Sequence, residues 1–168
     1  NTGRLPLSGT FQEIGLKRGE RVVGIGVVKE GAKLVIGTTA GMIKRVELAD
    51  VLSSRAEATW AAIIGLNGGG EEVLFAGVAS DAAHVMICTS GNKKLAPRVL
   101  RFEAGSINPQ ATPSAKGVNA IKMMGDQLVC GILVEPDLHK KGFAYAVTAN
   151  GHAKRIDIND FPVQGRGG

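Results

Sequence analysis

The stretch Thr148–Phe161, TANGHAKRIDINDF, decides how the rest of the sequence is interpreted. It places the dipeptide Asn150-Gly151 between two runs that can pair as strands, and a dibasic pair, Lys154-Arg155, follows the turn directly. Asn-Gly between such runs is the strongest short-range signal of a β-hairpin. Aliphatic and acidic residues then alternate, as they do in a half-buried strand. We therefore expect a hairpin here, with its basic pair just past the turn.

The same pattern occurs three times in the chain. Each copy has an apolar run, a turn rich in Thr or Ser that contains a glycine, and a lysine three positions after that glycine. The copies begin at Ala32, Ala83 and Phe143, their turn glycines are Gly41, Gly91 and Gly151, and their lysines are Lys44, Lys94 and Lys154. A repeated supersecondary unit predicts a repeat architecture rather than a single hairpin.

A second pattern precedes each hairpin copy and is called here the landmark segment. It consists of a glycine, an acid, one polar residue and an aliphatic run, and it begins at Gly19, Gly70 and Gly125. These glycines are 51 and then 55 residues apart, so each unit has about 50 to 60 residues. The strands expected in the first unit are Val22–Val28, Lys33–Thr38, Met42–Leu48 and Trp60–Leu66, and Gly117–Met124 is the counterpart of the last one in the second unit. Four short strands cannot bury both faces alone, which favours a propeller of packed units.

One stretch, Val46–Leu66, has the spacing of an amphipathic helix when it is taken alone. Its counterparts in the other copies contain prolines and glycines, which a helix interior does not tolerate cheaply. We therefore expect strand, loop and strand there, with one helical turn near Ser53–Ala58.

The amino-acid composition favours an all-β chain that binds a polyanion. Of 168 residues, 24 are glycine and only 4% are aromatic, which indicates many tight turns. The formal net charge of +5 is consistent with nucleic acid as a partner. Cys88 and Cys130 lie in apolar runs, and we interpret both as small buried residues in a reducing compartment. Without a long apolar segment or a leader, the expected location is the cytoplasm. A chain that begins with Asn and stops at GRGG is expected to be part of something longer.

The repeated hairpins, together with AKGVNAIKMMGDQLVCGILV, resemble the C-terminal domain of the A subunit of bacterial DNA gyrase and topoisomerase IV. The resemblance implies a β-pinwheel whose four-stranded blades exchange strands, around whose basic perimeter DNA bends. About three blades would form a partial or open ring. Residues 1–18 would be the tail of a preceding blade, and the blades would span residues 19–68, 69–124 and 125–168, the last of them truncated at its C-terminal end. It also implies a bacterial, nucleoid-associated, non-catalytic domain without cofactor. Its partners would be duplex DNA, the topoisomerase catalytic core with its other subunit, and a second copy that completes the ring.

A ring of basic residues just past the hairpin turns would follow a phosphate backbone without reading bases. The expected DNA-binding residues are Lys44, Arg45, Lys93, Lys94, Arg98, Arg101, Lys154, Arg155 and Arg166. Bending duplex DNA costs on the order of a few kcal/mol, which many phosphate contacts must offset. The alternative is a protein-interaction propeller with no DNA role, whose basic residues only keep strand edges soluble.

Other chemistry finds little support in the sequence. Gln164, Gly165, Arg166, Gly167 and Gly168 resemble the start of the gyrase-specific box, although Gly165 replaces a basic residue and the segment follows the third hairpin. No histidine stands at a metal-ligand spacing, so no metal site is expected. The turn Asn67–Glu72 carries two acids and is interpreted as a flexible turn between blades rather than a phosphate cradle. We expect Trp60 and Tyr145 to serve packing, not stacking on bases or catalysis.

Overall fold

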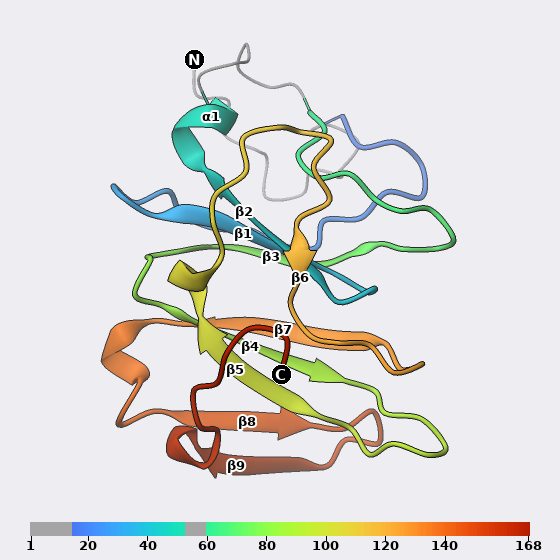
Figure 1. Cartoon of the computed structure of the whole chain (residues 1–168), viewed down its shortest axis with the longest axis vertical. Coiled ribbons are helices and arrows are strands. Elements are labelled where there is room, and N and C mark those ends of the chain that lie inside the picture. Colours follow the sequence, from blue (N-terminus) through green and yellow to red (C-terminus); the bar gives the residue numbers. More distant parts are fainter. Residues whose placement is uncertain (1–14, 53–59) are drawn as a thin grey trace, which may run out of the picture.

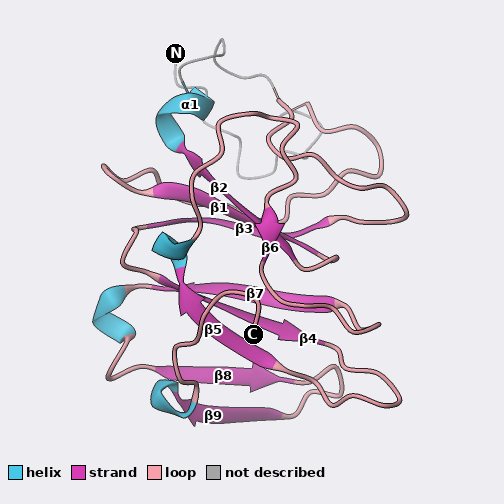
Figure 2. Ribbon diagram, in the orientation of Figure 1, coloured by secondary structure: helices cyan, strands magenta, loops and turns pink. Residues whose placement is uncertain are grey.

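The computed structural model describes residues 15–52 and 60–168, and its architecture is all-β, as expected (Figures 1 and 2). Three antiparallel sheets follow one another along the long axis of the molecule, and they do not close into a ring. The elements are β1 (Lys33–Thr38), β2 (Met42–Glu47), α1 (Leu48–Leu52), β3 (Val73–Ala79), β4 (His84–Thr89), β5 (Val99–Glu103), β6 (Val118–Asn119), β7 (Leu128–Val134), β8 (Phe143–Val147) and β9 (Ala153–Asp157).

Each predicted hairpin copy forms a hairpin: β1–β2, β4–β5 and β8–β9. The turn glycines Gly41, Gly91 and Gly151 all have positive φ, between 64° and 81°, a region that glycine enters without a Cβ penalty. The connection of the second hairpin is longer than the others, so its lysine three positions after the glycine lies in the loop. Cross-strand pairing shows which residues are equivalent in the three hairpins. Arg45, Arg101 and Arg155 are structural counterparts, and they pair with Val35, Met86 and Tyr145, respectively.

The hairpins exchange strands with the units that follow them. β3, from the second landmark segment, pairs with β1, and β7, from the third, pairs with β4. Both pairings are antiparallel, and both have a register shift at the same place, between Gly37 and Thr38 and between Cys88 and Thr89. The landmark strand of one repeat thus completes the sheet of the hairpin before it. The sheet orders are β3-β1-β2-β6, β5-β4-β7 and β8-β9.

Two predicted strands are wrong. Val22–Val28 and Trp60–Leu66 contain no strand, and Gly117–Met124 contains only the two residues of β6. The physical reason for the first is that β3 and β7 each add to a preceding hairpin, whereas the described chain has no hairpin before Val22–Val28. The helical turn expected near Ser53–Ala58 lies outside the described ranges, and α1 ends just before it.

The main core lies between the first two sheets. The ring of Phe75 on β3 packs directly against Gly37 on β1 and Gly131 on β7. A Cβ at either glycine would collide with this ring, so the two glycines make space for one aromatic side chain. The packing roles expected for Trp60 and Tyr145 are not seen as burial, because these side chains are 59% and 70% exposed. Cys130 is also exposed rather than buried, and it faces the half-buried Cys88 across the β4–β7 pair.

Candidate nucleic-acid interface

The basic residues predicted for a DNA track divide into a buried and an exposed set. Lys44 belongs to the buried set: its ammonium donates to the carbonyls of Ile63 at 2.8 Å and Thr112 at 2.7 Å. Burial lowers the pKa of this lysine. Its charge is thus used to tie two loops to β2 instead of meeting solvent.

Arg45 and Arg101 are buried at equivalent positions of their hairpins. Nη1 of Arg45 lies 2.9 Å from a carboxylate oxygen of Asp81, which sits in the turn between β3 and β4. Arg101 donates through Nη1 to the carbonyl of Ile158 at 2.9 Å and through Nη2 to that of His139 at 3.2 Å. In both cases the guanidinium binds to chain of the next repeat.

A pair of stacked histidines accompanies Arg101. The Nε–H of Arg101 donates to Nδ1 of His84 at 3.0 Å, and the rings of His84 and His139 stack with centroids 3.5 Å apart. Burial, His139 and Arg101 together lower the pKa of His84. The neutral form of His84 is therefore the one that fits this cluster, because its Nδ1 must accept a hydrogen bond.

These findings correct part of the sequence interpretation. Lys44, Arg45 and Arg101 were expected on an exposed rim, but each is buried and directs its donors at protein groups. For Arg45 and Arg101, the physical reason is that β3 and β7 each add a strand to a hairpin and bring the chain that follows over the basic position. Lys44 is covered instead by the loops that hold Ile63 and Thr112. Arg45 of the first hairpin and its counterpart Arg101 of the second therefore act as structural clamps.

Arg98 is intermediate between the two sets. Its guanidinium lies 3.0 Å from a carboxylate oxygen of the fully buried Asp126 side chain and donates to the carbonyl of Lys122 at 3.0 Å. The backbone N–H of Met124, the hydroxyl of Thr89 and Arg98 itself hold the pKa of Asp126 well below its usual range. Arg98 thus has a structural partner while part of its side chain still meets solvent.

The exposed set comprises Lys93, Lys94, Lys154, Arg155 and Arg166. Lys93 and Lys94 lie in the β4–β5 loop, where Asn92 Oδ1 accepts from the backbone N–H of Lys94 at 2.9 Å. Lys154 and Arg155 lie on β9, and Arg155 stacks over the Phe143 ring at 4.6 Å. In Figure 1 the three hairpin connections lie along the same side of the molecule, on the right in this view.

The segment Gln164–Gly168, which resembles the start of the gyrase box, runs back over the middle of the molecule. The backbone N–H of Gln164 donates to Arg101, that of Gly167 donates to Ala120, and Arg166 Nη1 donates to the carbonyl of Asn119 at 2.7 Å. Its glycine backbone is therefore tied to β5 and to the chain after β6. The side chain of Arg166 remains exposed despite that hydrogen bond.

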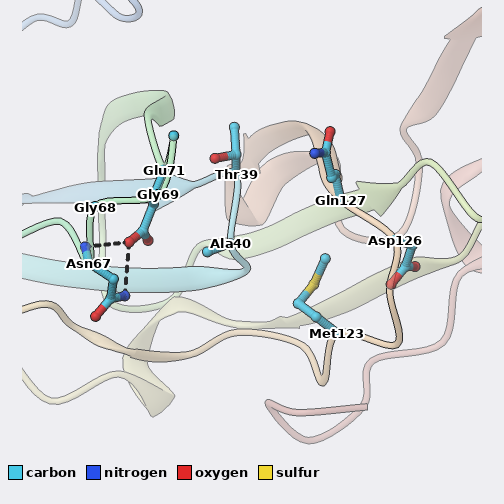
Figure 3. A pocket seen from close by; sticks show the side chains of 10 residues that line it. Thr39, Ala40, Asn67, Gly68, Gly69, Glu71, Met123, Asp126 and Gln127 are labelled. Carbon is cyan, nitrogen blue, oxygen red and sulfur yellow. Dashed lines mark hydrogen bonds between the residues drawn. The ribbon is translucent and has the colours of Figure 1, made fainter.

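A small cavity lies beside the turn Asn67–Glu72, and its volume is about 300 Å³ (Figure 3). Its acidic lining residues are Glu71 and Asp126. Glu71 accepts hydrogen bonds from the N–H and side-chain amide of Asn67, so side-chain contacts hold the turn that the sequence predicted to be flexible. Burial acts to raise the pKa of Glu71, but these bonds and that from Thr38 outweigh it and lower the pKa.

Sequence reasoning missed that these acids connect repeats. The hydroxyl of Thr38, at the end of β1, donates to Glu71, and Thr89, at the end of β4, hydrogen bonds to Asp126. Both threonines are buried, and both acids are the second residue of a landmark segment. The repeated threonine and the repeated acid were each visible in the sequence, but their partnership was not, since it joins successive repeats.

Metal-binding clusters and membrane-spanning helices are both absent from the described ranges, 15–52 and 60–168. Neither range holds three or more His, Cys, Asp or Glu side chains gathered as metal ligands would be. No helix there has the length and apolar character needed to cross a bilayer.

Comparison with known proteins gives concordant matches. A family model described as the DNA gyrase C-terminal domain, beta-propeller, matches residues 32–57 and 145–168. The A subunit of DNA gyrase from Salmonella typhimurium is 27% identical over 155 residues, which cover 90% of this chain and 16% of that protein. The solved DNA gyrase A C-terminal domain has a TM-score of 0.77 at 20% identity over 96% of this chain and 51% of that one. The C-terminal domain of DNA topoisomerase IV has a TM-score of 0.68 at 18% identity, covering 83% and 40%.

These matches confirm the resemblance that the repeated hairpins indicated, and the fold is that of the gyrase A C-terminal β-pinwheel domains, left unclosed. The family model covers the first and third hairpins, the two whose dibasic pairs agree most closely. The chain spans about a sixth of the length of the gyrase protein that it matches.

Proposed function

Given this relation to gyrase A C-terminal domains, we propose that the chain binds and bends duplex DNA without sequence preference, as a non-catalytic part of a type IIA topoisomerase. It would present the bound DNA segment to the catalytic core, which lies on another region of polypeptide, and to the other subunit. Its location would be the bacterial cytoplasm, in association with the nucleoid.

The observation that carries the proposal is the exposed basic set beside the hairpin connections. Lys93, Lys94 and Lys154 are exposed lysines in or next to the second and third hairpin connections, which lie on one side of the molecule with the first (Figure 1). Lysines placed along one edge suit a phosphate backbone, which is recognised by charge and position rather than by base identity. The net charge of +5 favours association with such a polyanion.

The buried set has a different role in this proposal. Arg45 and Arg101 hold successive repeats together, so they fix the spacing between the hairpin connections. A bent duplex needs contacts at fixed intervals to offset its deformation energy. Rigid junctions would therefore favour bending over loose attachment.

A salt titration of duplex binding tests the proposal. The logarithm of the affinity for a fluorescent duplex is expected to fall linearly with the logarithm of salt concentration, by about 0.9 per phosphate contact, and equally for unrelated sequences. Replacing Lys93 and Lys94 with alanine should weaken binding. The matched control replaces Lys140 and Lys141, which are exposed between β7 and β8 and carry the same charge.

The second candidate function is a protein-interaction module with no DNA role. Its supporting observation is the set of exposed apolar side chains on β8, which includes Phe143, Tyr145 and Val147. Duplex affinity that is absent, or that does not change with salt, would favour this function over DNA binding.

A further inference from the structure

Cys88 and Cys130 are the two cysteines of the chain, and they lie directly opposite each other on neighbouring strands. Cys88 lies near the end of β4 and Cys130 lies on β7, and the two strands run antiparallel and side by side in the second sheet (Figure 1). Opposite residues of an antiparallel pair project their side chains to the same face of the sheet. The fold therefore brings together two thiols that are far apart in the sequence.

The backbone spacing at this pair suits a disulfide bond. Opposite residues in antiparallel strands have Cα atoms about 4.5 to 5.5 Å apart, and a disulfide usually joins Cα atoms about 4.4 to 6.8 Å apart. The S–H of Cys88 also donates a hydrogen bond to the sulfur of Cys130, so the two sulfur atoms already face each other. An S–S bond can therefore form without a change of strand partners.

The first sheet shows that this position does not need thiols in order to fold. Both sheets have a register shift directly before a buried threonine, and the pair of the first sheet that corresponds to Cys88 and Cys130 is Gly37 and Phe75. In that sheet the position serves packing, because the ring of Phe75 lies against Gly37. The second sheet thus carries two reactive groups where the first carries a glycine and an aromatic ring.

The two thiols differ in exposure and in acidity. Cys130 is exposed, whereas Cys88 is half-buried. The hydrogen bond from the Cys88 thiol, together with the backbone N–H of Cys88, lowers the pKa of Cys130 to about 6, while the same side-chain bond and burial raise the pKa of Cys88. Cys130 is therefore the thiol that ionises first, and the thiolate is the form that attacks an oxidant. An accessible thiol of low pKa beside a second thiol is the arrangement found in redox-sensing cysteines.

We propose that Cys88 and Cys130 form a reversible redox site, at which a hydroperoxide oxidises Cys130 and Cys88 then closes a disulfide between β4 and β7. The bond joins the second hairpin covalently to the landmark strand of the third repeat. Disulfides that occur in a reducing compartment are usually transient, and they are typically catalytic or redox-sensing. The site lies outside the exposed basic set, and its tests are made without DNA.

Oxidation takes two steps. The Cys130 thiolate attacks one oxygen of the hydroperoxide, so an S–O bond forms and the O–O bond breaks, and the leaving oxygen takes up the proton that Cys130 had released to solvent. The sulfur of Cys88 then attacks the sulfenic acid on Cys130, so the S–S bond forms, the S–O bond breaks, and the hydroxide leaves as water with the proton of Cys88. The two sulfurs together lose two electrons, which the peroxide gains.

A low-molecular-weight thiol reverses the bond. Its thiolate attacks one sulfur of the disulfide, which breaks the S–S bond and leaves a mixed disulfide beside one free cysteine. A second reagent thiolate attacks the reagent's sulfur in the mixed disulfide, so the other cysteine leaves and the two reagent molecules end as a disulfide. The two electrons of the reagent thus return both cysteines to thiols.

Mass spectrometry of the 168-residue chain treated with hydrogen peroxide tests bond formation. The expected product is a single chain that has lost the mass of two hydrogen atoms and that yields a linked pair of peptides, containing Cys88 and Cys130, after proteolysis. Dithiothreitol should restore the starting mass. Oxygen added at a cysteine without a disulfide, or chains linked to one another instead, would overturn the proposal.

Comparison with the unfolded chain separates a built site from the ordinary reactivity of thiols. At pH 6 the disulfide should form about tenfold faster in the folded chain than in the same chain in urea, because Cys130 is already partly ionised and Cys88 is held beside it. Both samples contain the same thiols and the same peroxide concentration, and no variant is needed. Equal rates would reduce the pair to ordinary thiols and overturn the proposal.

Serine variants test which thiol reacts first. Cys88→Ser keeps a hydroxyl donor beside Cys130 but removes the second thiol, so a sulfenic acid should accumulate and be trapped by dimedone. Cys130→Ser leaves only the half-buried thiol and should be labelled about tenfold less under the same conditions. Equal labelling of the two variants, or stronger labelling of Cys130→Ser, contradicts the role given to Cys130.

Discussion

Arg101 and Arg155 occupy the same position in successive hairpins, yet one is buried and the other exposed. Arg101 is covered by chain of the next repeat and donates to its carbonyls, whereas Arg155 stacks over Phe143 of its own hairpin. Arg45, covered by the turn that holds Asp81, behaves like Arg101. The difference teaches that this hairpin position acts as a clamp where chain of the next repeat covers it and supplies the acceptors, as at Arg45 and Arg101.

The largest expected effect is the difference in stability between alanine variants of Arg101 and Arg155. Arg101→Ala should lower the free energy of unfolding by about 3 kcal/mol, since it leaves buried carbonyls and His84 without their donor. Arg155→Ala should change it by less than about 0.5 kcal/mol, because the Arg155 side chain is exposed. Urea denaturation measures both. Equal losses would contradict the assignment of Arg101, and not Arg155, as a clamp.

The turn glycines Gly91 and Gly151 allow the second and third hairpins to be compared at another position. Gly91→Ala should cost about 2 to 3 kcal/mol, because a Cβ would meet the backbone of Leu95 and Pro97 in addition to the positive φ. Gly151→Ala has the same φ problem but open space around it, so about 1 kcal/mol is expected. Thermal unfolding compares the two variants. A larger loss at Gly151 would refute the packing difference.

The threonine–acid pairs offer a smaller contrast. Thr38→Val should destabilise by about 1 to 2 kcal/mol, since the buried hydroxyl that donates to Glu71 is lost while the shape is kept. Thr148→Val, which removes only an exposed hydroxyl of the third turn, should cost about 0.5 kcal/mol or less. Chemical denaturation in the same buffer distinguishes them, and similar costs would count against the connecting role of Thr38.

Acidification should destabilise the buried clamp at His84, whose Nδ1 accepts a hydrogen bond from Arg101. The folded state lowers the pKa of His84 from its ordinary value of 6.5, so the unfolded chain takes up the proton first as pH falls. Stability is then lost progressively below about pH 6.5. His84→Gln should flatten this part of the pH profile, which urea denaturation at several pH values measures. A pH profile of stability that His84→Gln leaves unchanged would exclude His84 as the source of this pH dependence.

The sequence predicted the fold well where a feature repeats within one unit. Lys33–Thr38 is a strand with the predicted bounds, and the three turn glycines have positive φ. The strand predicted at Val22–Val28 is wrong, because β3 and β7 form by pairing with a neighbouring hairpin and Val22–Val28 has no such pairing within the described ranges. Lys94 was matched to Lys44 by its distance from the turn glycine, but the longer second loop makes Arg101 the counterpart of Arg45.

Burial of the candidate site was the least predictable property. Lys44, Arg45 and Arg101 are charged residues that a sequence pattern places on a surface, and their burial depends on carbonyls and a carboxylate supplied by distant segments. Lys93, Lys94 and Lys154 were predicted as exposed DNA contacts, and their exposure is observed while their contact with DNA stays a prediction.

The most direct test of the central claim measures the salt dependence of duplex affinity for one triple variant. If the exposed lysines bind phosphates, replacing Lys93, Lys94 and Lys154 with alanine should reduce the slope of log affinity against log salt by about three. The urea midpoint should stay unchanged, since these side chains are exposed. A slope equal to that of the unmodified chain would contradict the claim.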